Sequence, residues 1–370
     1  MFIDKIEKAI LLKQLQTVIG VVERKQPLPI LSNVLIEKRG SSLQLTTTDL
    51  EIQISSQLND HQQINTDEAI TVGAKKLQEI LRVSPEDSKI SLEIKDNKVQ
   101  IKINKSRFTL QTLPPTDFPK ISVNTTESHS FHFSQEKLKK MINMVQYAMA
   151  QQDIRYYLNG VLLVIDETSL KLIATDGHRL AFVETKINIE NPKFKQEIIL
   201  PRKTINELVK LLSDTDEPIK FNLAENQAQM HFSNISLITK IIDGKFPDYN
   251  RVIPKYTNHL TLNKVLIIQA LQRAAILSNE KFKGIRFVLT EKNLRLISSN
   301  NEQEESQEDI ETDYMGIALD IGFNVNYLLD GLNNIQEETV IFSFGDANSS
   351  ILLTIPENES FKYVVMPMRI

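Results

Sequence analysis

The sequence predicts an α+β fold in which one unit, with two helices and antiparallel sheets, is repeated three times. A motif of alternating leucines that ends in Asp or Asn recurs at 43–49, 170–176 and 294–300. The copies are 127 and 124 residues apart, close to one third of the 370-residue chain. Helix patterns and strand patterns recur with the same step. A long period that keeps its internal order predicts a repeated domain.

Two amphipathic helices are expected in each repeat. Apolar residues recur at intervals of three and four, which places them on one face of a helix. Ser134 is suited to cap one of these helices, because its hydroxyl can accept a hydrogen bond from a free backbone N–H. The expected helices cover 11–22, 74–82, 134–149, 202–212, 264–277 and 325–332.

Short segments between the helices alternate with period two, which is typical of half-buried strands. They include 99–103, 108–110, 131–133 and 260–262. A turn marker containing proline closes each repeat, at 117–119, 245–247 and 365–367. Together these features predict three domains, at residues 1–125, 126–253 and 254–370.

The composition excludes several classes of protein. Lys and Arg number 43 against 47 Asp and Glu, so the net charge of −4 argues against a strongly basic nucleic-acid coat protein. The absence of Cys excludes disulfide frameworks, zinc fingers and cysteine nucleophiles. No apolar run is long enough to span a membrane, and Lys13 interrupts the N-terminal run that a signal peptide would need. There is no glycine-rich phosphate loop.

One segment, 175–179, has the residue types of an enzyme. Asp176, His178 and Arg179 together suggest acid–base chemistry, as in a hydrolase. The corresponding segments of the other repeats contain neither His nor Arg, so the Asp is more simply a residue of the turn that ends a strand. His129 and His132 fall on opposite faces of an expected strand, which argues against a metal site.

An acidic run at 302–313 contains no basic residue. Its spacing and its lack of the required glycine do not fit an EF-hand calcium loop. A solvated acidic loop and an electrostatic docking surface are the remaining interpretations.

The helices carry the opposite charge to the whole chain. The segments 74–82, 134–149 and 202–212 are each net +2, whereas the chain is −4. Three basic helices on one side of the molecule would form a surface that follows DNA phosphates. The helix at 325–332 departs from this pattern, since Asp330 stands where the others have bases.

Five segments are specific enough to indicate a family, 155–160, 174–180, 246–249, 275–282 and 363–369. Through them, the sequence resembles the bacterial DNA sliding clamps, the β subunits of the replicative DNA polymerase III, from end to end. It departs from that family at 21–27, where a glycine-bearing stretch is usual, and at Ile370, where leucine is commoner.

The resemblance implies a head-to-tail homodimer, a closed ring of six domains with helices around the hole and sheets at the rim. Such a ring encircles double-stranded DNA without sequence preference and has no catalytic activity, cofactor or metal. Its expected partners are the DNA polymerase III α subunit, an ATP-driven clamp loader, and other polymerases and repair proteins that carry a clamp-binding peptide. The expected location is cytoplasmic.

The resemblance also implies three sets of site residues. DNA would be contacted by Lys25, Lys75, Gln152, Tyr156, Tyr157, Arg202 and Lys203. The partner peptide would bind in a pocket of Leu158, Thr175, Gly177, His178, Arg179, Leu180, Pro247, Arg251, Val252, Asn324, Tyr327, Ser350, Val364, Val365, Met366, Pro367, Met368 and Arg369. The dimer contact would use Phe108, Leu110, Ile276 and Leu277, with Lys76, Lys105 and Arg107 facing Glu302, Glu304 and Glu305.

Two other functions remain as alternatives to a DNA tether. A hydrolase should have a nucleophile or metal set that survives comparison of the repeats, and none does. A three-repeat scaffold that binds only proteins has no need of net-positive helices on a net-negative chain.

Overall fold

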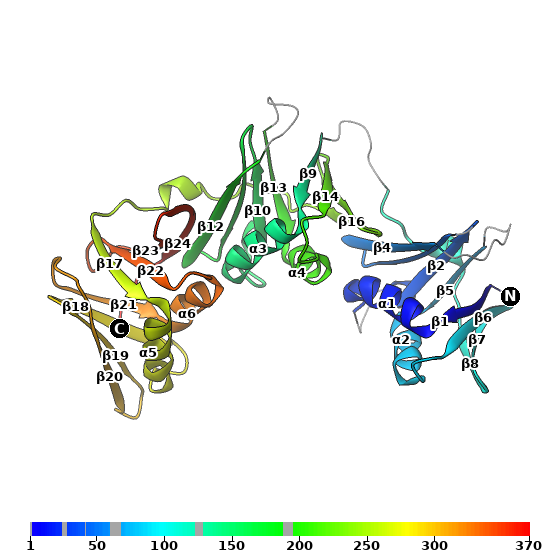
Figure 1. Cartoon of the computed structure of the whole chain (residues 1–370), viewed down its shortest axis with the longest axis horizontal. Helices are drawn as coiled ribbons and strands as arrows, with labels where there is room; N and C mark the ends of the chain where they lie inside the picture. Colours follow the sequence, from blue (N-terminus) through cyan, green and yellow to red (C-terminus); the bar gives the residue numbers. More distant parts are fainter. Residues whose placement is uncertain (1, 24–27, 41, 60–67, 123–128, 188–194) are drawn as a thin grey trace. The chain divides into compact units, whose positions relative to one another are not determined.

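The computed structural model describes residues 2–23, 28–40, 42–59, 68–122, 129–187 and 195–370 (Figure 1). The chain forms two compact units. Unit 1 contains Met1–Lys137 and Asn206–Ile241, and unit 2 contains Leu138–Ile205 and Ile242–Ile370. In both units, helices cover antiparallel sheets, as expected for the α+β class.

Unit 1 contains a four-stranded and an eight-stranded sheet, with helices α1 (Lys8–Val18) and α2 (Ala74–Val83). The smaller sheet has the order β1 (Ile3–Glu7), β6 (Lys89–Lys95), β7 (Lys98–Ile103) and β8 (Ser106–Gln111). The larger has the order β5 (Glu68–Gly73), β2 (Asn33–Arg39), β3 (Ser42–Thr48), β4 (Ile52–Asn59), β16 (Ile235–Lys240), β15 (Gln227–Phe232), β14 (Pro218–Leu223) and β9 (His129–Ser134).

Unit 2 has the same two kinds of sheet, with helices α5 (Lys264–Ile276) and α6 (Val325–Asn334). Its larger sheet has the order β13 (Gln196–Pro201), β10 (Gly160–Ile165), β11 (Ser169–Thr175), β12 (Arg179–Lys186), β24 (Asn358–Val365), β23 (Ile351–Ile355), β22 (Thr339–Phe344) and β17 (Asn258–Asn263). The smaller has the order β20 (Glu305–Glu311), β19 (Asn293–Ser299), β18 (Gly284–Thr290) and β21 (Leu319–Asn324).

Two further helices, α3 (Gln135–Val145) and α4 (Arg202–Leu211), complete the three pairs. The expected helices are confirmed, with earlier ends at two places. A 3₁₀ turn at Ile19–Val21 follows α1, and another at Gln146–Ala148 follows α3, so Val22 and Met149 lie outside the helices. Both side chains are still buried, because the tighter turn directs the chain back toward the core.

The repeated motif folds in the same way in all three copies. It forms β3, β11 and β19, and its last residue is Asp49, Asp176 or Asn300. Each of these side chains accepts hydrogen bonds from backbone N–H groups two to four residues later. The interpretation of the Asp as a turn residue is therefore confirmed.

Each eight-stranded sheet consists of two four-stranded halves joined by one antiparallel strand pair. In unit 1, β4 pairs with β16, from Ile52↔Thr239 to Ser56↔Ile235. In unit 2, β12 pairs with β24, from Arg179↔Val365 to Val183↔Phe361. We call these pairings the β4–β16 joint and the β12–β24 joint.

The acidic run is a strand over most of its length, so the expectation of a solvated loop is wrong for residues 305–311. These residues form β20, which follows the third motif copy as β4 and β12 follow the first two. Its side chains alternate between exposed and half-buried, because α5 packs against one face. Arg273 on that helix pairs with Glu308, with Nη2 and Oε2 2.7 Å apart.

The first residue of each repeat's first helix contacts the end of its second helix. The Lys8 amine donates to the Ser84 carbonyl (2.5 Å) and the Lys264 amine to the Ile335 carbonyl (2.7 Å). A cation there donates hydrogen bonds to the last carbonyls and interacts favourably with the negative end of the helix dipole. In the middle repeat, Gln135 accepts from the Ser213 N–H instead (3.2 Å), and its Nε2 has no partner among the described residues.

Candidate functional site

The β12–β24 joint brings the residues expected to bind a partner peptide into one region of unit 2. Arg179 lies opposite Val365 and Leu180 opposite Val364 in the paired strands. The second and third repeats therefore meet here within a single chain.

An apolar cluster lies at this joint. Leu158, Leu180, Phe246 and Val364 are buried in it, and Tyr157 packs against it half-buried. Val364 and Val365 belong to an interior strand of the sheet, so their side chains support the site from within the fold.

The residues after β24 form a short tail fixed at two backbone positions. The Met366 N–H donates to the His178 carbonyl (2.9 Å), and the Met368 N–H donates to the Gly322 carbonyl (2.8 Å). A Cβ on Gly322 would lie 2.5 Å from the Met368 carbonyl oxygen, so only glycine permits this approach. The side chains of Met366 and Arg369 remain exposed.

The turn at 175–180 is tightly hydrogen-bonded. The Thr175 hydroxyl donates to the Arg179 carbonyl (2.6 Å) and accepts from the Gly177 N–H (3.1 Å). Gly177 has a φ of +90°, and a Cβ there would lie 3.0 Å from the Arg155 guanidinium. Arg155 in turn donates to the Asp176 carbonyl (3.2 Å), so glycine admits a neighbouring arginine at this point.

Arg179 has a different role from the one expected. Its guanidinium donates to Asp176 (3.0 Å), to Asp330 (2.5 Å) and to the Tyr147 carbonyl (2.6 Å). It also lies 4.4 Å from the centre of the Tyr327 ring, and its side chain is only 10% exposed. These bonds hold β12, α6 and the turn after α3 together. Because its donors are already paired, the guanidinium has little capacity to bind a ligand.

Burial opposes the charge on Arg179, but the surrounding acceptors outweigh it. Tyr363, Asp330 and Asp176 raise the pKa of the guanidinium above its ordinary value. Burial raises the pKa of Tyr147, so its phenol stays protonated beside this charge. Asp330 and Tyr147 were not predicted as site residues, because each is distant from Arg179 in the sequence and neither belongs to a recognisable motif.

Other predicted pocket residues surround this network. The His178 and Tyr327 rings stack with centroids 6.4 Å apart, and Asn324 caps α6 by accepting from the Asn326 N–H (2.9 Å). The Ser350 carbonyl accepts from the Tyr256 hydroxyl (2.7 Å). Exposed side chains of the same compact unit include Pro247, Arg251 and Val252.

The residues expected to contact DNA fall into separate groups. In unit 2, Gln152 has a φ of +54°, Tyr156 is 58% exposed, and Tyr157 stands edge-on to it with ring centroids 6.0 Å apart. In unit 1, Lys75 lies half-buried on α2. Lys25 lies outside the described residues.

Arg202 positions the loop that carries the two tyrosines. Its guanidinium donates to the carbonyls of Met149 (3.1 Å) and Ala150 (3.3 Å). The expected phosphate contact would therefore compete with these internal bonds. Lys203, the next residue on α4, lies half-buried.

The residues expected at a subunit contact lie at the margins of the two units. Phe108 and Leu110 are half-buried on β8, the end strand of its sheet. Ile276 is the last residue of α5 and is 77% exposed, and the half-buried Leu277 follows it.

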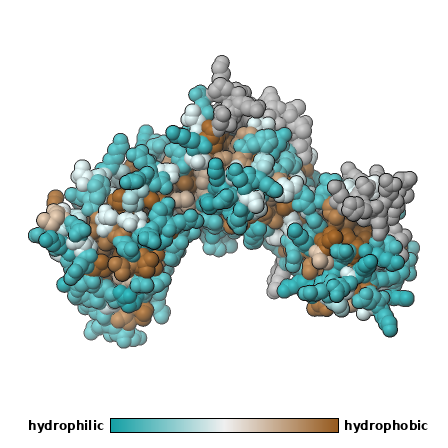
Figure 2. All heavy atoms as spheres, in the orientation of Figure 1, coloured by the Kyte–Doolittle hydropathy of each residue, from teal (hydrophilic) through white to brown (hydrophobic). Residues whose placement is uncertain are grey.

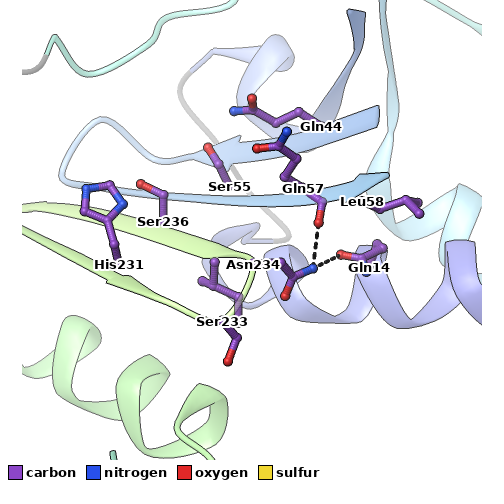
Figure 3. Close-up of a pocket in the computed structure, with 10 residues that line it drawn as sticks. Gln14, Gln44, Ser55, Gln57, Leu58, His231, Ser233, Asn234 and Ser236 are labelled. Atoms are coloured by element: carbon purple, nitrogen blue, oxygen red, sulfur yellow. Dashed lines mark hydrogen bonds between the residues drawn. The ribbon is translucent and has the colours of Figure 1, made fainter. Parts of the chain in front are cut away.

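A polar hollow of about 830 Å³ adjoins the β4–β16 joint (Figure 3). Asn234, at the tip of the β15–β16 hairpin, donates to the Gln57 carbonyl (2.7 Å) and to the Gln14 side chain (3.2 Å). The rest of the hollow is lined mostly by hydroxyl and carboxamide groups, together with His231. The hollow therefore offers hydrogen bonds and no formal charge at neutral pH.

Two expectations about ions and membranes concern the described residues as a whole. In that part of the chain, no three His, Cys, Asp or Glu side chains are placed to hold a metal ion. None of its helices has the length and apolar character needed to cross a membrane.

The fold and the two joints define a class of protein, an α+β chain of repeated domains that share sheets across their boundaries. Family models of the DNA polymerase III beta subunit match the chain in order. The N-terminal domain matches residues 2–122, the central domain 132–248 and the C-terminal domain 250–369.

Whole-chain relatives agree with this assignment. The beta sliding clamp of Pseudomonas putida is 43% identical over 366 residues, and that of Escherichia coli K12 is 39% identical, each with 99% of both chains covered. The crystal structure of the DNA polymerase III subunit beta from Pseudomonas aeruginosa matches with a TM-score of 0.95 at 41% identity and 99% coverage of both chains. A sliding clamp from that organism bound to griselimycin matches with a TM-score of 0.94.

The chain belongs to the DNA polymerase III beta subunit family, the β sliding clamps. It is a non-catalytic processivity subunit of DNA polymerase III built from three β-clamp domains, and its partners are DNA and the polymerase. The hydrolase alternative is therefore wrong. Asp176 and Arg179 are engaged in structural contacts rather than in acid–base chemistry.

Proposed function

We propose that two copies of this chain close head-to-tail into a ring around duplex DNA. The observation that carries the proposal is the pattern of strand joints. The strand after each motif copy is β4, β12 or β20, and the last strand of each repeat is β8, β16 or β24. Within the chain, β4 pairs with β16 and β12 with β24. The equivalent pairing left over is β20 with β8, the end strands of the two four-stranded sheets.

A pairing between β20 of one copy and β8 of another repeats the joints already formed within the chain. Such a heterologous contact closes into a ring when successive rotations from copy to copy add up to a full turn. Here the turn would be complete after two copies and six domains. An end strand left unpaired is also a liability for aggregation, which the pairing removes.

The chemistry of the two edges supports the same contact. Glu305 and Glu311 lie exposed on β20, whereas Arg107 lies exposed on β8 beside the half-buried Phe108 and Leu110. Opposite charges set the orientation of the pairing, and burial of apolar side chains such as Ile276 contributes about 1.5–3 kcal/mol each.

Within such a ring the DNA contacts are weak and independent of sequence. Lys75 and Lys203 serve as phosphate contacts, with Arg202 available only if its internal bonds open. Gln152, Tyr156 and Tyr157 form a loop on which bases at a primer end can stack. Retention comes from topology, since a protein that held many phosphates tightly would not slide. Lys25 stays a prediction.

The region around the β12–β24 joint is the partner site in this proposal. Its apolar cluster and exposed tail suit a short peptide bearing Leu or Phe, and Met366 and Met368 adapt to different peptides. Peptides of the DNA polymerase III α subunit, the clamp loader, and other polymerases and repair proteins would share it. Affinity in the micromolar range, about −8 kcal/mol, is expected. The domain limits 1–125, 126–253 and 254–370 and the cytoplasmic location stay predictions.

Retention on DNA of different topology tests the proposal. The protein is loaded onto a nicked circular plasmid by a clamp loader with ATP and then separated from free protein by gel filtration. A topological tether co-elutes with the circle and is lost after a restriction enzyme linearises it. A protein scaffold never co-elutes, and retention on linear DNA would contradict a topological hold.

The dimer contact has its own test in analytical ultracentrifugation. Ile276→Ala with Leu277→Ala should give monomers at micromolar concentration, because the contact loses its apolar side chains. Ile154→Ala serves as a matched control, since Ile154 is a comparably exposed apolar residue outside the predicted contact. A double variant that remains dimeric would reject this interface.

A further inference from the structure

The helices of the first and third repeats differ in the fate of their basic side chains. In the first repeat, Lys8 donates to the Ser84 carbonyl at the end of α2. Four further basic side chains remain, Lys13 on α1 and Lys75, Lys76 and Arg82 on α2. None of the four side chains has a hydrogen bond or ion pair within the described part of the chain, and all except the half-buried Lys75 are exposed. These cations are available to an external anion.

In the third repeat, both basic side chains of α5 are already in use. The Lys264 amine donates to the carbonyls of Ile335 (2.7 Å) and Gln336 (3.3 Å), beyond the end of α6. Arg273 forms a two-point ion pair with Glu308, at 2.9 and 2.7 Å. That bond raises the pKa of Arg273 and lowers the pKa of Glu308, as expected for a stable pair.

The remaining outer surface of α5 is uncharged. Val265 is 49% and Leu266 58% exposed, and Gln269 and Gln272 continue the same side of the helix toward Ile276. Figure 2 shows hydrophobic surface over this part of unit 2. The companion helix α6 contains neither Lys nor Arg, and its Asp330 is paired with Arg179.

We propose that phosphate contact in this clamp is uneven around the ring. The helices of the first repeat supply cations, whereas α5 and α6 form an uncharged sector past which the duplex slides without ion pairs. The inference rests on the proposed ring, in which the helices face the DNA. It follows from electrostatics, because only cations free to neutralise phosphates release counterions and contribute to affinity.

The salt dependence of duplex binding tests this distribution. Fluorescence anisotropy with a 30-bp duplex gives the slope of log K against log salt concentration. Each lost phosphate contact lowers that slope by about 0.9, so Lys13→Gln with Lys75→Gln should reduce it by about 1.8 for each copy whose helices contact the duplex. Lys89→Gln with Lys98→Gln removes the same charge from exposed positions on β6 and β7 and should leave it unchanged.

The reciprocal variant adds cations to the uncharged sector. Gln269→Lys with Gln272→Lys should steepen the slope by up to about 1.8 for each copy, because the new side chains form ion pairs with phosphates that the natural glutamines cannot form. An unchanged slope for Lys13→Gln with Lys75→Gln, or for the added lysines, would overturn the proposal. Failure of the ring itself is distinguishable, since the natural protein would then not be retained on circular DNA.

Discussion

The two joints within this chain have the same antiparallel backbone pairing but different side chains. At the β4–β16 joint, the buried polar residues Gln53, Ser55, Ser56 and Thr239 lie among the buried apolar Ile52, Ile54, Leu237 and Ile238. At the β12–β24 joint, the corresponding stretch buries Leu180, Phe182, Val183, Phe361, Tyr363 and Val364. Antiparallel backbone pairing sets the geometry of both joints, so their side chains can differ without changing how the strands pair.

The polar groups of the β4–β16 joint are satisfied by neighbouring parts of the same compact unit. The hydroxyls of Thr46 and Ser55 lie 3.0 Å apart, the Gln53 side chain accepts from the Ile121 N–H (2.9 Å), and Ser56 donates to Gln14. A hydrogen-bond network of this kind stabilises a joint.

The apolar joint leaves adaptable surface at its margin. Burial of its large side chains supplies the stability, and the single polar network, around Arg179, is directed inward. The comparison supports the β12–β24 joint as the proposed partner site, because its stability does not depend on a hydrogen-bond network exposed to the ligand.

The largest expected effect comes from emptying the apolar joint. Phe182 is buried in its cluster and contacts Tyr249, with ring centroids 5.9 Å apart. Phe182→Ala should lower the free energy of unfolding by about 3–5 kcal/mol, because it removes apolar contacts and leaves a cavity. Denaturant titration measures this. A loss below 1 kcal/mol would show that the cluster does not stabilise the joint.

Removal of one charge from the Arg179 network should have a smaller effect. Asp330→Asn should cost about 1–3 kcal/mol, because a guanidinium that is 10% exposed loses a charged acceptor. Weaker peptide binding should accompany the loss, since Arg179 fixes the His178 turn. The matched control is Asp320→Asn, whose pair with Arg286 is exposed on both sides and contributes at most about 1 kcal/mol. Equal effects in the two variants would contradict the positioning role.

The polar joint should respond to loss of its hairpin contact. Asn234→Ala removes hydrogen bonds to Gln57 (2.7 Å), Gln14 (3.2 Å) and Ser56 (3.2 Å) at a cost of about 1 kcal/mol. Peptide affinity should not change, because the proposed partner site lies at the other joint. A fluorescence polarisation titration measures the peptide affinity. Weaker peptide binding by the variant would contradict the distinction between the joints.

The smallest expected effect is on the pH dependence of the polar joint. Burial and then the charge of Lys220 lower the pKa of His231 from 6.5, so the folded state favours the neutral ring. As the pH falls below 6.5 the unfolded chain binds this proton first, and stability is lost until the folded-state pKa is passed. The drop in melting temperature between pH 7.5 and 5.5 should be smaller for His231→Gln than for the natural protein. An equal drop would show that His231 does not contribute.

The sequence predicted the parts of the fold that rest on local pattern. The alternating motif, the turn at Asp49 and Asp176, and the helix faces all depend on neighbours within a few residues. The acidic β20 was missed because a charged end strand lacks the apolar alternation that marks buried strands. The contacts of Lys8 with Ser84 and Lys264 with Ile335 join residues 76 and 71 positions apart, and no local signal reports them.

The candidate site was predicted by resemblance more than by residue chemistry. The resemblance identified most of the side chains around the β12–β24 joint, but not which of them are engaged in internal contacts. Arg179 was expected in the peptide pocket, whereas its guanidinium is bonded to the Tyr147 carbonyl and to Asp330 from distant parts of the chain. Only tertiary structure shows which polar groups are already satisfied.

A peptide titration of a chain truncated after Val365 tests the assignment of the partner site to the apolar joint most directly. Residues Met366–Ile370 lie beyond β24, whereas Val364 and Val365 are buried in the sheet and must be kept. We expect the truncated protein to remain dimeric and to unfold cooperatively, and to bind a fluorescent clamp-binding peptide of the DNA polymerase III α subunit at least about tenfold more weakly, a loss of about 1.4 kcal/mol. Unchanged affinity in a folded, dimeric truncated protein would contradict the assignment.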